Sequence, residues 1–386
     1  MRQISYIAEA TRLAQELIRV PSLSGEEEGV ASCVEAEMRL WGYDCVERDE
    51  LGNVVGVVCG RREGRCVIFD AHMDTVPVAD PAAWRHPPFA AQREEGRLWG
   101  RGAADVKGSL AALVVAVGSL AGKLDCGRVI VAATVGEERI EGLGLGHVLA
   151  RRPADGVVVC EPTGLRVGIG HKGRMGIVVS AKGRAAHSSQ PEQGLNAVYR
   201  LMEAIAAIRT LPAQEDDLLG HGVNELVEII SSPYPGTSMV PSGCRARFDR
   251  RLVRGETLES VLQEMRQAVA PFEGVSVEVH RGHLTTYTGC VFDVDDYQPA
   301  WAQAKDGELV RVAQRALRAI GQEAALFVAP YCTDGSVAAE HLGLPTILYG
   351  AGEVSEAHIV DESISLEELG AAFEGYRALA LALTAA

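Results

Sequence analysis

The 386-residue sequence has no pair of cysteines in a C-x-x-C arrangement. Its nine cysteines are instead scattered between Cys33 and Cys332. This spacing excludes both a zinc ribbon and a thioredoxin-type redox motif. An odd number of scattered cysteines is typical of a reducing compartment, where the residue serves as a small buried hydrophobe.

A long apolar run is also lacking at the start of the chain. Residues 1–20 alternate charged and apolar positions at helical spacing, and they contain no stretch of signal-peptide or membrane-spanning length. We therefore expect a mature cytoplasmic protein that has no membrane partner.

Basic residues are in the minority, with 37 Lys and Arg against 52 Asp and Glu and a formal net charge of −15. A surface of this sign excludes nucleic acid as the expected partner. The contents of 47% hydrophobic and 23% charged residues are ordinary for a globular protein, and no internal repeat or low-complexity tract is present. At roughly 100 to 200 residues per domain, the length predicts two domains.

Both ends of the chain have α/β patterning. Short apolar runs alternate with helical stretches such as residues 106–120. The runs are residues 54–59, 66–71, 129–135, 157–160 and 346–349. Runs of this length predict strands that are buried on both faces of a sheet. We therefore expect a layered α/β catalytic domain with a central, mostly parallel sheet.

The middle of the chain has a different order of elements. The periodicity predicts a strand at 167–181, a helix at 195–210, strands at 224–231 and 243–252, a helix at 256–269 and a strand at 275–281. This βαββαβ order is that of a ferredoxin-like α+β domain. Helices predicted at 306–321 and 366–384 resume the α/β pattern, which makes the middle domain an insertion.

The predicted division is residues 1–166 for the first part of the catalytic domain, 167–283 for the inserted dimerisation or lid domain, and 284–386 for the second part. The segment 283–305 is long for a plain connection. We expect it to be a return linker or a substrate-facing loop.

Polar residues follow the predicted strands at their carboxyl ends. His72 and Asp74 come directly after the run at 66–71. Period-two alternation puts both on one face of the strand end, where open α/β sheets bind ligands. An ordinary polar turn is the alternative.

Three further strand or helix ends carry carboxylates. Asp105 lies between glycines just before the helical stretch at 106–120. Taken alone, an Asp at this position is more typical of a helix N-cap than of a metal ligand. Glu137 and Glu138 end the run at 129–135, and adjacent like charges there are costly unless a cation neutralises them. Glu161 follows the run at 157–160.

One more imidazole completes the set, because His358 follows the last apolar run beyond a glycine-rich turn. The combined set is His72, Asp105, Glu138, Glu161 and His358. Two imidazoles and three carboxylates suit two divalent ions, each with one His and one private carboxylate, the third carboxylate bridging. Two ions about 3.5 to 4 Å apart can activate a shared water and polarise a carbonyl.

In these motifs, in their order and in the inserted domain, the whole chain resembles peptidase family M20. This is the co-catalytic metal family of aminoacylases, carboxypeptidases, acetylornithine deacetylases and succinyl-diaminopimelate desuccinylases. Within it the sequence is similar to a branch of hydrolases linked to selenium or purine metabolism. The resemblance implies that Asp105 bridges two ions, with His72 and Glu161 on one and Glu138 and His358 on the other. The implied metal is zinc, with cobalt or manganese as alternatives.

The resemblance also implies the catalytic residues. Glu137 matches the general base, which takes a proton from the attacking water and passes it to the leaving amine. Asp74 matches an acid that orients His72. His187, by itself a surface or turn residue, matches a histidine that reaches across a homodimer interface to stabilise the oxyanion. A cis peptide is implied after Asp105.

Substrate contacts are implied at three positions. Asn196 and Arg251 match residues that bind a substrate carboxylate. The run Asp249-Arg250-Arg251 leaves open which guanidinium faces the substrate. Thr333 lies where the family places a substrate-contacting loop, but its surroundings depart from the Gly-Gly-Thr-rich form of the desuccinylases. This departure argues against a succinyl substrate.

The sequence thus predicts a di-metal hydrolase that cleaves the amide bond of an N-acyl amino acid or a dipeptide-like small molecule through a water activated by Glu137. Two alternatives stay open. One is hydrolysis of a carbamoyl or cyclic amide, and the other is a non-catalytic binding protein that retains the fold. The presence of the base and of every expected ligand opposes the second alternative.

Overall fold

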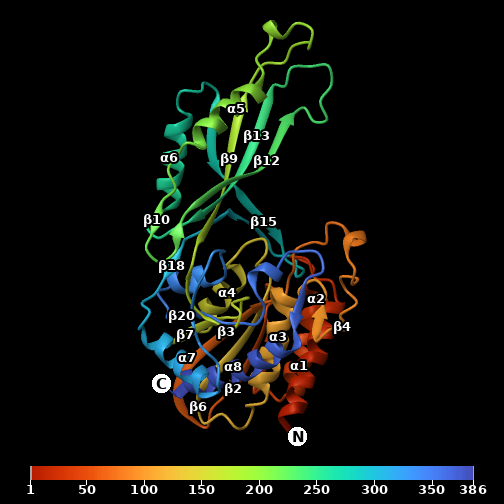
Figure 1. Ribbon diagram of the computed structural model, residues 1–386, viewed down its shortest axis with the longest axis vertical. Helices are drawn as coiled ribbons and strands as arrows, with labels where there is room; N and C mark the ends of the chain where they lie inside the picture. Colours follow the sequence, from red (N-terminus) through yellow and green to blue (C-terminus); the bar gives the residue numbers. More distant parts are fainter. Residues whose placement is uncertain (1, 386) are drawn as a thin grey trace.

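A computed structural model describes residues 2–385, and it has two domains stacked along the long axis of the molecule (Figure 1). The larger domain is made from both ends of the chain, and the smaller one is made from its middle. This arrangement confirms the expected fold class, a layered α/β domain with an α+β domain inserted into it.

The larger domain is built on a nine-stranded mixed sheet. In spatial order its strands are β1 (Cys45–Arg48), β2 (Val54–Cys59), β6 (Cys126–Thr134), β3 (Arg62–His72), β7 (Gly156–Val159), β20 (Thr346–Leu348), β8 (Val167–His171) and β18 (Trp301–Ala302), with β19 (Leu326–Ala329) also paired to β8. The four central strands β6, β3, β7 and β20 are parallel, whereas β1, β2 and β18 pair antiparallel towards the edges. The parallel strands end at the same edge of the sheet, so the residues that follow them meet there.

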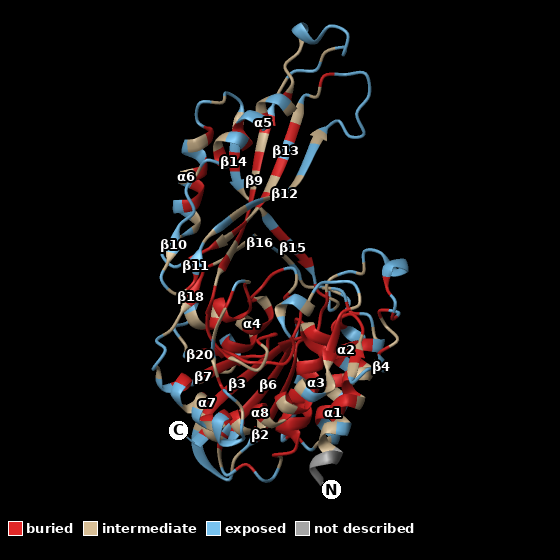
Figure 2. Ribbon diagram, in the orientation of Figure 1, coloured by how far each residue is buried: buried red, intermediate tan, exposed pale blue. Residues whose placement is uncertain are grey.

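Helices cover both faces of this sheet. Strand β3 shows why, because Val67, Phe69 and Ala71 pack into one layer while Cys66 and Ile68 pack into the other. The first layer contains α1 (Arg2–Arg19), α2 (Glu28–Leu40), α3 (Gly108–Gly118), α7 (Glu308–Ala319) and α8 (Leu366–Ala385), and the second contains α4 (Leu143–Arg151). Figure 2 shows the buried core concentrated in this domain. The five apolar runs are confirmed as strands that are buried on both faces.

The smaller domain has the predicted βαββαβ order. Its elements are β9 (Gly173–Lys182), α5 (Ala197–Ile208), β12 (Val223–Ser232), β13 (Gly243–Leu252), α6 (Leu258–Val269) and β14 (Val275–Val279). The sheet order is β12-β13-β9-β14, with the short β17 (Tyr297–Gln298) also on β9. Helices α5 and α6 pack on it to form a separate core. Strand β12 lies at an edge of this sheet, and within residues 2–385 no strand pairs with its outer side.

Two local predictions are wrong. The strand expected at 167–181 is two strands, since β8 joins the large sheet and β9 joins the small one. The loop expected at 283–305 contains a hairpin, β15 (Arg281–Thr285) with β16 (Val291–Asp295). At its tip the Tyr287 hydroxyl donates to the Gly52 carbonyl at 2.6 Å, so the hairpin is tied to the larger domain. The domain boundaries at 166/167 and 283/284 stay predictions.

Shorter elements complete the described chain. They are the sheet β21 (Ser363–Ser365), β5 (Arg97–Trp99) and β4 (Gln92–Glu94), the hairpin β10 (Glu215–Asp216) and β11 (Gly220–His221), and the single turns η1 (Pro81–Ala83), η2 (Ala103–Lys107), η3 (Pro191–Gln193), η4 (Val337–His341) and η5 (Val354–Glu356). Within residues 2–385, none of the helices combines the length and the apolar character needed to span a bilayer.

Candidate active site

The first cluster of potential ligands is centred on His72, the last residue of β3. Its Nε2 lies 3.0 Å from Asp105 Oδ1 and 3.7 Å from Glu161 Oε1. Its Nδ1 is 2.9 Å from the carbonyl oxygen of Asp74. A carbonyl can only accept, so Nδ1 carries a proton and Nε2 is the nitrogen directed at the two carboxylates.

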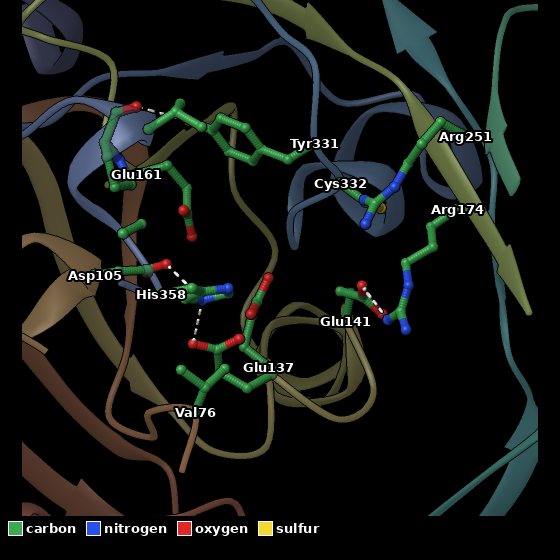
Figure 3. A pocket seen from close by; sticks show the side chains of 14 residues that line it. Val76, Asp105, Glu137, Glu141, Glu161, Arg174, Arg251, Tyr331, Cys332 and His358 are labelled. Carbon is green, nitrogen blue, oxygen red and sulfur yellow. Dashed lines mark hydrogen bonds and ion pairs between the residues drawn. The ribbon is translucent and has the colours of Figure 1, made fainter. Parts of the chain in front are cut away.

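The second cluster is centred on His358. Its Nε2 lies 3.0 Å from Glu138 Oε1 and 3.1 Å from Asp105 Oδ2 (Figure 3). The two oxygens of Asp105 thus face two different histidines, each of which has a further carboxylate beside it. The geometry places all five predicted ligands in one region at the carboxyl edge of the sheet.

A local irregularity of the chain holds Asp105 in this position. The peptide bond between Asp105 and Val106 is cis, as the family resemblance implied. The N-cap alternative for Asp105 is wrong, because α3 begins after Lys107 and has no side-chain cap. The Asp105 amide instead donates to the buried carboxylate of Glu362 at 3.1 Å, a contact that joins segments 257 residues apart.

The negative charge of the site changes the pKa of both imidazoles. Hydrogen bonds to Asp105 and Glu138 raise the pKa of His358 to about 10. Burial acts to lower the pKa of His72, but the surrounding carboxylates outweigh it and raise that pKa. Burial and the neighbouring Asp105 charge raise the pKa of Glu161. A site with so many carboxylates requires positive charge, from protonated histidines or from cations.

The donor atoms fit two divalent ions. His72, Asp105 and Glu161 form one group, and Asp105, Glu138 and His358 form the other, with the ligand atoms of each group within 4.8 Å of one another. Each group offers one imidazole nitrogen and two carboxylate oxygens, which is a donor set suited to zinc, cobalt or manganese.

Glu137 is buried at the wall of the same cavity. Burial raises its pKa well above the usual range, and the negative charges of Glu161 and Asp334 act in the same direction. The pKa shift favours the protonated form and makes this carboxylate a stronger proton acceptor than an exposed one.

Asp74 acts on the neighbouring turn through its carboxylate. Its two oxygens accept the backbone N–H groups of Glu137 at 3.1 Å and Glu138 at 3.0 Å, and one also accepts the Ser24 hydroxyl at 2.6 Å. The carboxylate is 3.7 Å from His72 Nδ1, so the closer contact with that ring comes from the Asp74 backbone carbonyl. Asp74 thus touches both the imidazole and the turn that carries the two glutamates.

A cavity of about 330 Å³ extends from the two clusters to the smaller domain, where Arg174 and Arg251 line it. Figure 3 shows the two guanidinium groups facing the carboxylates across this space. Arg250, the neighbour of Arg251, instead pairs with Glu256 at 2.5 Å and Glu264 at 2.7 Å away from the cavity. Of the two arginines that the sequence left open, Arg251 is the one that faces the cavity.

Five predicted residues are not part of the cavity lining. His72 and Asp74 lie behind it and contact the lining residues. The other three are His187, Asn196 and Thr333. His187 lies in the loop before α5, where its Nδ1 contacts the Ser189 hydroxyl at 2.7 Å. Asn196 caps α5 by accepting the Val198 N–H at 2.9 Å. Thr333 is fully buried, while its neighbours Tyr331 and Cys332 line the cavity instead. The roles of His187, Asn196 and Thr333 stay predictions.

Several residues of the site were missed by the sequence reasoning. They are Glu141, Arg174, Tyr331, Cys332, Asp334 and Glu362. The available signals were weak: Glu141 follows the Glu137-Glu138 turn, and Arg174 lies in a strand where alternate residues share a face. Asp334, one residue after Thr333, accepts the Gly142 N–H at 2.5 Å and so holds the far end of the same turn.

Comparison with known proteins agrees with this geometry. The sequence profile of peptidase family M20/M25/M40 matches residues 68–382. The chain is 31% identical over 372 residues to the protein YgeY of Escherichia coli (strain K12), covering 92% of this chain and 90% of that protein. It is 30% identical over 281 residues to the succinyl-diaminopimelate desuccinylase of Caulobacter sp. (strain K31), covering 69% of this chain and 72% of the relative.

A solved structure has the same fold at lower identity. The tripeptidase from Staphylococcus aureus subsp. aureus mu50 superimposes with a TM-score of 0.76 at 20% identity, covering 98% of each chain. The family profile extends over most of the chain, and the site has the acidic and imidazole ligands that a metal-dependent hydrolase requires. The chain therefore belongs to peptidase family M20/M25/M40 and is a metal-dependent peptidase or deacylase.

Proposed function

We propose that the protein is a di-metal-dependent hydrolase that cleaves the amide bond of an N-acyl amino acid or a dipeptide-like substrate. The observation that carries this proposal is the position of Asp105, whose two oxygens face two separate His–carboxylate pairs. Glu137 lines the same cavity as these groups.

In this proposal His72 and Glu161 would hold one ion, Glu138 and His358 would hold the other, and Asp105 would contribute an oxygen to each. Zinc is the expected metal, with cobalt and manganese as alternatives that the nitrogen and oxygen donors also accept. When bound, the two ions supply Lewis acidity that lowers the pKa of a water and polarises the scissile carbonyl.

The protein residues move the proton and hold the reacting groups. Glu137 accepts the proton of the attacking water and returns it to the nitrogen of the leaving amine. Asp74 holds the backbone of Glu137 and, through its own carbonyl, fixes the proton on Nδ1 of His72.

Substrate binding is assigned first to Arg251. Its Nε pairs with Asp249 Oδ1 at 2.8 Å, and the rest of its guanidinium is available for a substrate carboxylate. Thr333 is proposed to act through the loop that carries Tyr331 and Cys332. The cavity volume of about 330 Å³ is at the lower end of the range for small-molecule sites, which suits an acyl amino acid or a dipeptide.

His187 and Asn196 require a second chain in this proposal. The edge strand β12 and the outer side of α5 expose large apolar side chains that a homodimer would cover. These side chains are Val223, Val227, Ile229 and Ile230 on β12 and Tyr199 and Met202 on α5. Exposed apolar side chains gathered at an open sheet edge are typical of an interaction surface. In such a dimer, His187 of one chain would supply the oxyanion donor for the cavity of the other.

The test begins with the purified protein in the reducing conditions expected of the cytoplasm. We expect up to two equivalents of zinc, cobalt or manganese per chain by elemental analysis, and hydrolysis of members of a panel of N-acyl amino acids and dipeptides. Chelation should abolish this hydrolysis, and added metal should restore it. Release of the free amine and acid supports amide cleavage, whereas release of carbon dioxide and ammonia would show a carbamoyl substrate. Absence of turnover in the metal-loaded protein across the whole panel would refute the proposal.

A further inference from the structure

Two guanidinium groups lie side by side on the wall of the cavity that faces the metal ligands. Arg251 on β13 and Arg174 on β9 are direct partners in the register of the small sheet. Both side chains line the cavity. Two adjacent arginines could in principle bind two carboxylates of one substrate, because each guanidinium presents a fork of donors.

The two arginines are not equally available. Arg174 donates through Nη1 to Glu141 Oε1 at 2.8 Å and through Nε to Asp249 Oδ2 at 3.0 Å. In the described chain, the ion pairing of Arg251 is confined to the contact of its Nε with Asp249. A substrate carboxylate therefore meets one guanidinium with free donors and one that already has a carboxylate from the protein.

The backbone on both sides of Glu141 is held by hydrogen bonds, and its carboxylate pairs with Arg174. Its backbone carbonyl accepts a hydrogen bond from the side chain of Gln298, and the next amide, Gly142 N–H, donates to the buried carboxylate of Asp334. The residue itself is 8% exposed. Both flanking backbone groups are bound, so the main chain of Glu141 is fixed beside Arg174.

We infer that Glu141 makes the cavity select substrates by their charge. It acts as a built-in carboxylate on Arg174, so that the cavity accepts substrates with one carboxylate, bound by Arg251, and rejects those with a second carboxylate beside it. This inference rests on the proposed amide hydrolysis and narrows it to acyl groups or side chains that carry no further negative charge.

Charge balance is the physical reason. Before any substrate enters, Arg174 and Arg251 already have the carboxylates of Glu141 and Asp249 beside them, and Asp296 lies 3.9 Å from Arg174. One substrate carboxylate finds free donors on Arg251. A second one would lie next to Glu141 without a free cation, and like charges brought together in a partly buried site are unfavourable.

The test uses substrates of the same shape that differ by one charge. An N-succinyl amino acid carries the second carboxylate, and the corresponding N-succinamoyl amino acid replaces it with a neutral amide. For the metal-loaded wild-type protein we expect kcat/KM to favour the succinamoyl substrate by about 30-fold or more. The variant Glu141→Gln keeps the shape of the side chain and should reduce this preference at least about tenfold, mainly through a lower KM for the succinyl substrate.

Glu35→Gln is the matched control. Glu35 lies on α2 and pairs with Arg48 at 2.6 Å and with Arg39, away from the cavity. This variant loses the same charge from a paired glutamate, and it should keep the wild-type preference. Thermal unfolding of both variants shows whether the fold is retained.

A binding measurement keeps the inference testable apart from turnover. Calorimetry on the metal-loaded protein should show that glutaramate binds more tightly than glutarate to the wild type, and that Glu141→Gln loses this difference. Equal use of the two substrates by the wild type, or an unchanged preference in Glu141→Gln, would overturn the inference and leave the proposed hydrolysis intact. Loss of turnover on every substrate with the binding preference retained would instead refute the proposed function alone.

Discussion

The carboxyl edge of the large sheet and the surface of the small domain contribute to the site in different ways. The sheet edge brings His72 and Asp105 together with His358, which lies more than 250 residues further along the same chain. In the small domain, His187 and Asn196 lie outside the cavity of their own chain. A parallel sheet gathers strand ends by its topology, whereas residues on an inserted domain reach a site only through the placement of whole domains or of a second chain.

The largest expected effect is a loss of activity that distinguishes the general base from the metal ligands at the sheet edge. Glu137→Gln should lower kcat by at least about a thousandfold, because it removes the proton acceptor, while the metal content is retained. Glu138→Gln is the adjacent control and should lose metal, since its carboxylate belongs to the second cluster. Activity assays and elemental analysis of both variants distinguish the two roles, and loss of metal from Glu137→Gln would contradict this assignment.

The second prediction tests whether the small domain acts across a dimer. His187→Ala should lower kcat by about a hundredfold or more, because it removes a donor to the oxyanion. Mixed dimers of His187→Ala with Glu137→Gln contain one cavity with both residues intact. Refolding the two inactive variants together should therefore restore up to about a quarter of the wild-type activity when the chains mix at random. A mixture as inactive as its components would exclude action of His187 in the partner's cavity.

The third prediction concerns the turn that joins the base to the cavity wall. Asp334→Ala should lower kcat about 10- to 100-fold, because the buried Gly142 N–H loses its acceptor and the turn from Glu137 to Glu141 is held less firmly. Asp334→Asn keeps an acceptor of the same shape and should retain most of the activity. Steady-state kinetics on folded protein, checked by circular dichroism, measure the difference. Equal losses in both variants would show that the charge of Asp334 matters rather than the hydrogen bond.

The smallest effect is a pH dependence of stability that arises where the two domains join. Burial lowers the pKa of His171 from 6.5 to about 4 in the folded protein, and Nδ1 of the neutral ring donates to the Lys172 carbonyl. Below pH 6.5 the unfolded chain takes up a proton that the folded chain does not. The contribution of the neutral ring to the free energy of unfolding is therefore complete above pH 6.5. This contribution falls by about 3 kcal/mol as the pH is lowered to 4.

His171→Gln should reduce the difference in unfolding free energy between pH 4.5 and pH 7, measured by denaturant titration. The exposed His221→Gln is the control and should keep the wild-type difference. If His171→Gln keeps it as well, the acid sensitivity arises at another group.

Sequence reasoning succeeded where the signal is local. The buried strands could be predicted because continuous runs of β-branched residues have few other stable environments. The five potential ligands could be found because each one follows such a run or a glycine turn. The hairpin β15–β16 was missed because only Gly282 and Leu284 of β15 are buried, and its other side chains are polar enough to suggest a loop.

The direction of Arg250 and Arg251 shows where local signals end. Alternation along β13 requires the two side chains to point to opposite faces of the small sheet. It does not say which face looks towards the larger domain. That choice depends on how the two domains are joined, and the contacts of Arg250 with Glu256 and Glu264 become visible only in the folded chain.

The amino-acid sequence alone determined the order of the elements, the inserted domain and the set of residues able to hold two cations, because periodicity and spacing act over a few residues. Tertiary structure alone decided that the oxygens of Asp105 face different histidines and that Glu141 forms an ion pair with Arg174. These contacts join segments that are distant along the chain, and their geometry follows from the packing of whole sheets and domains rather than from any local preference.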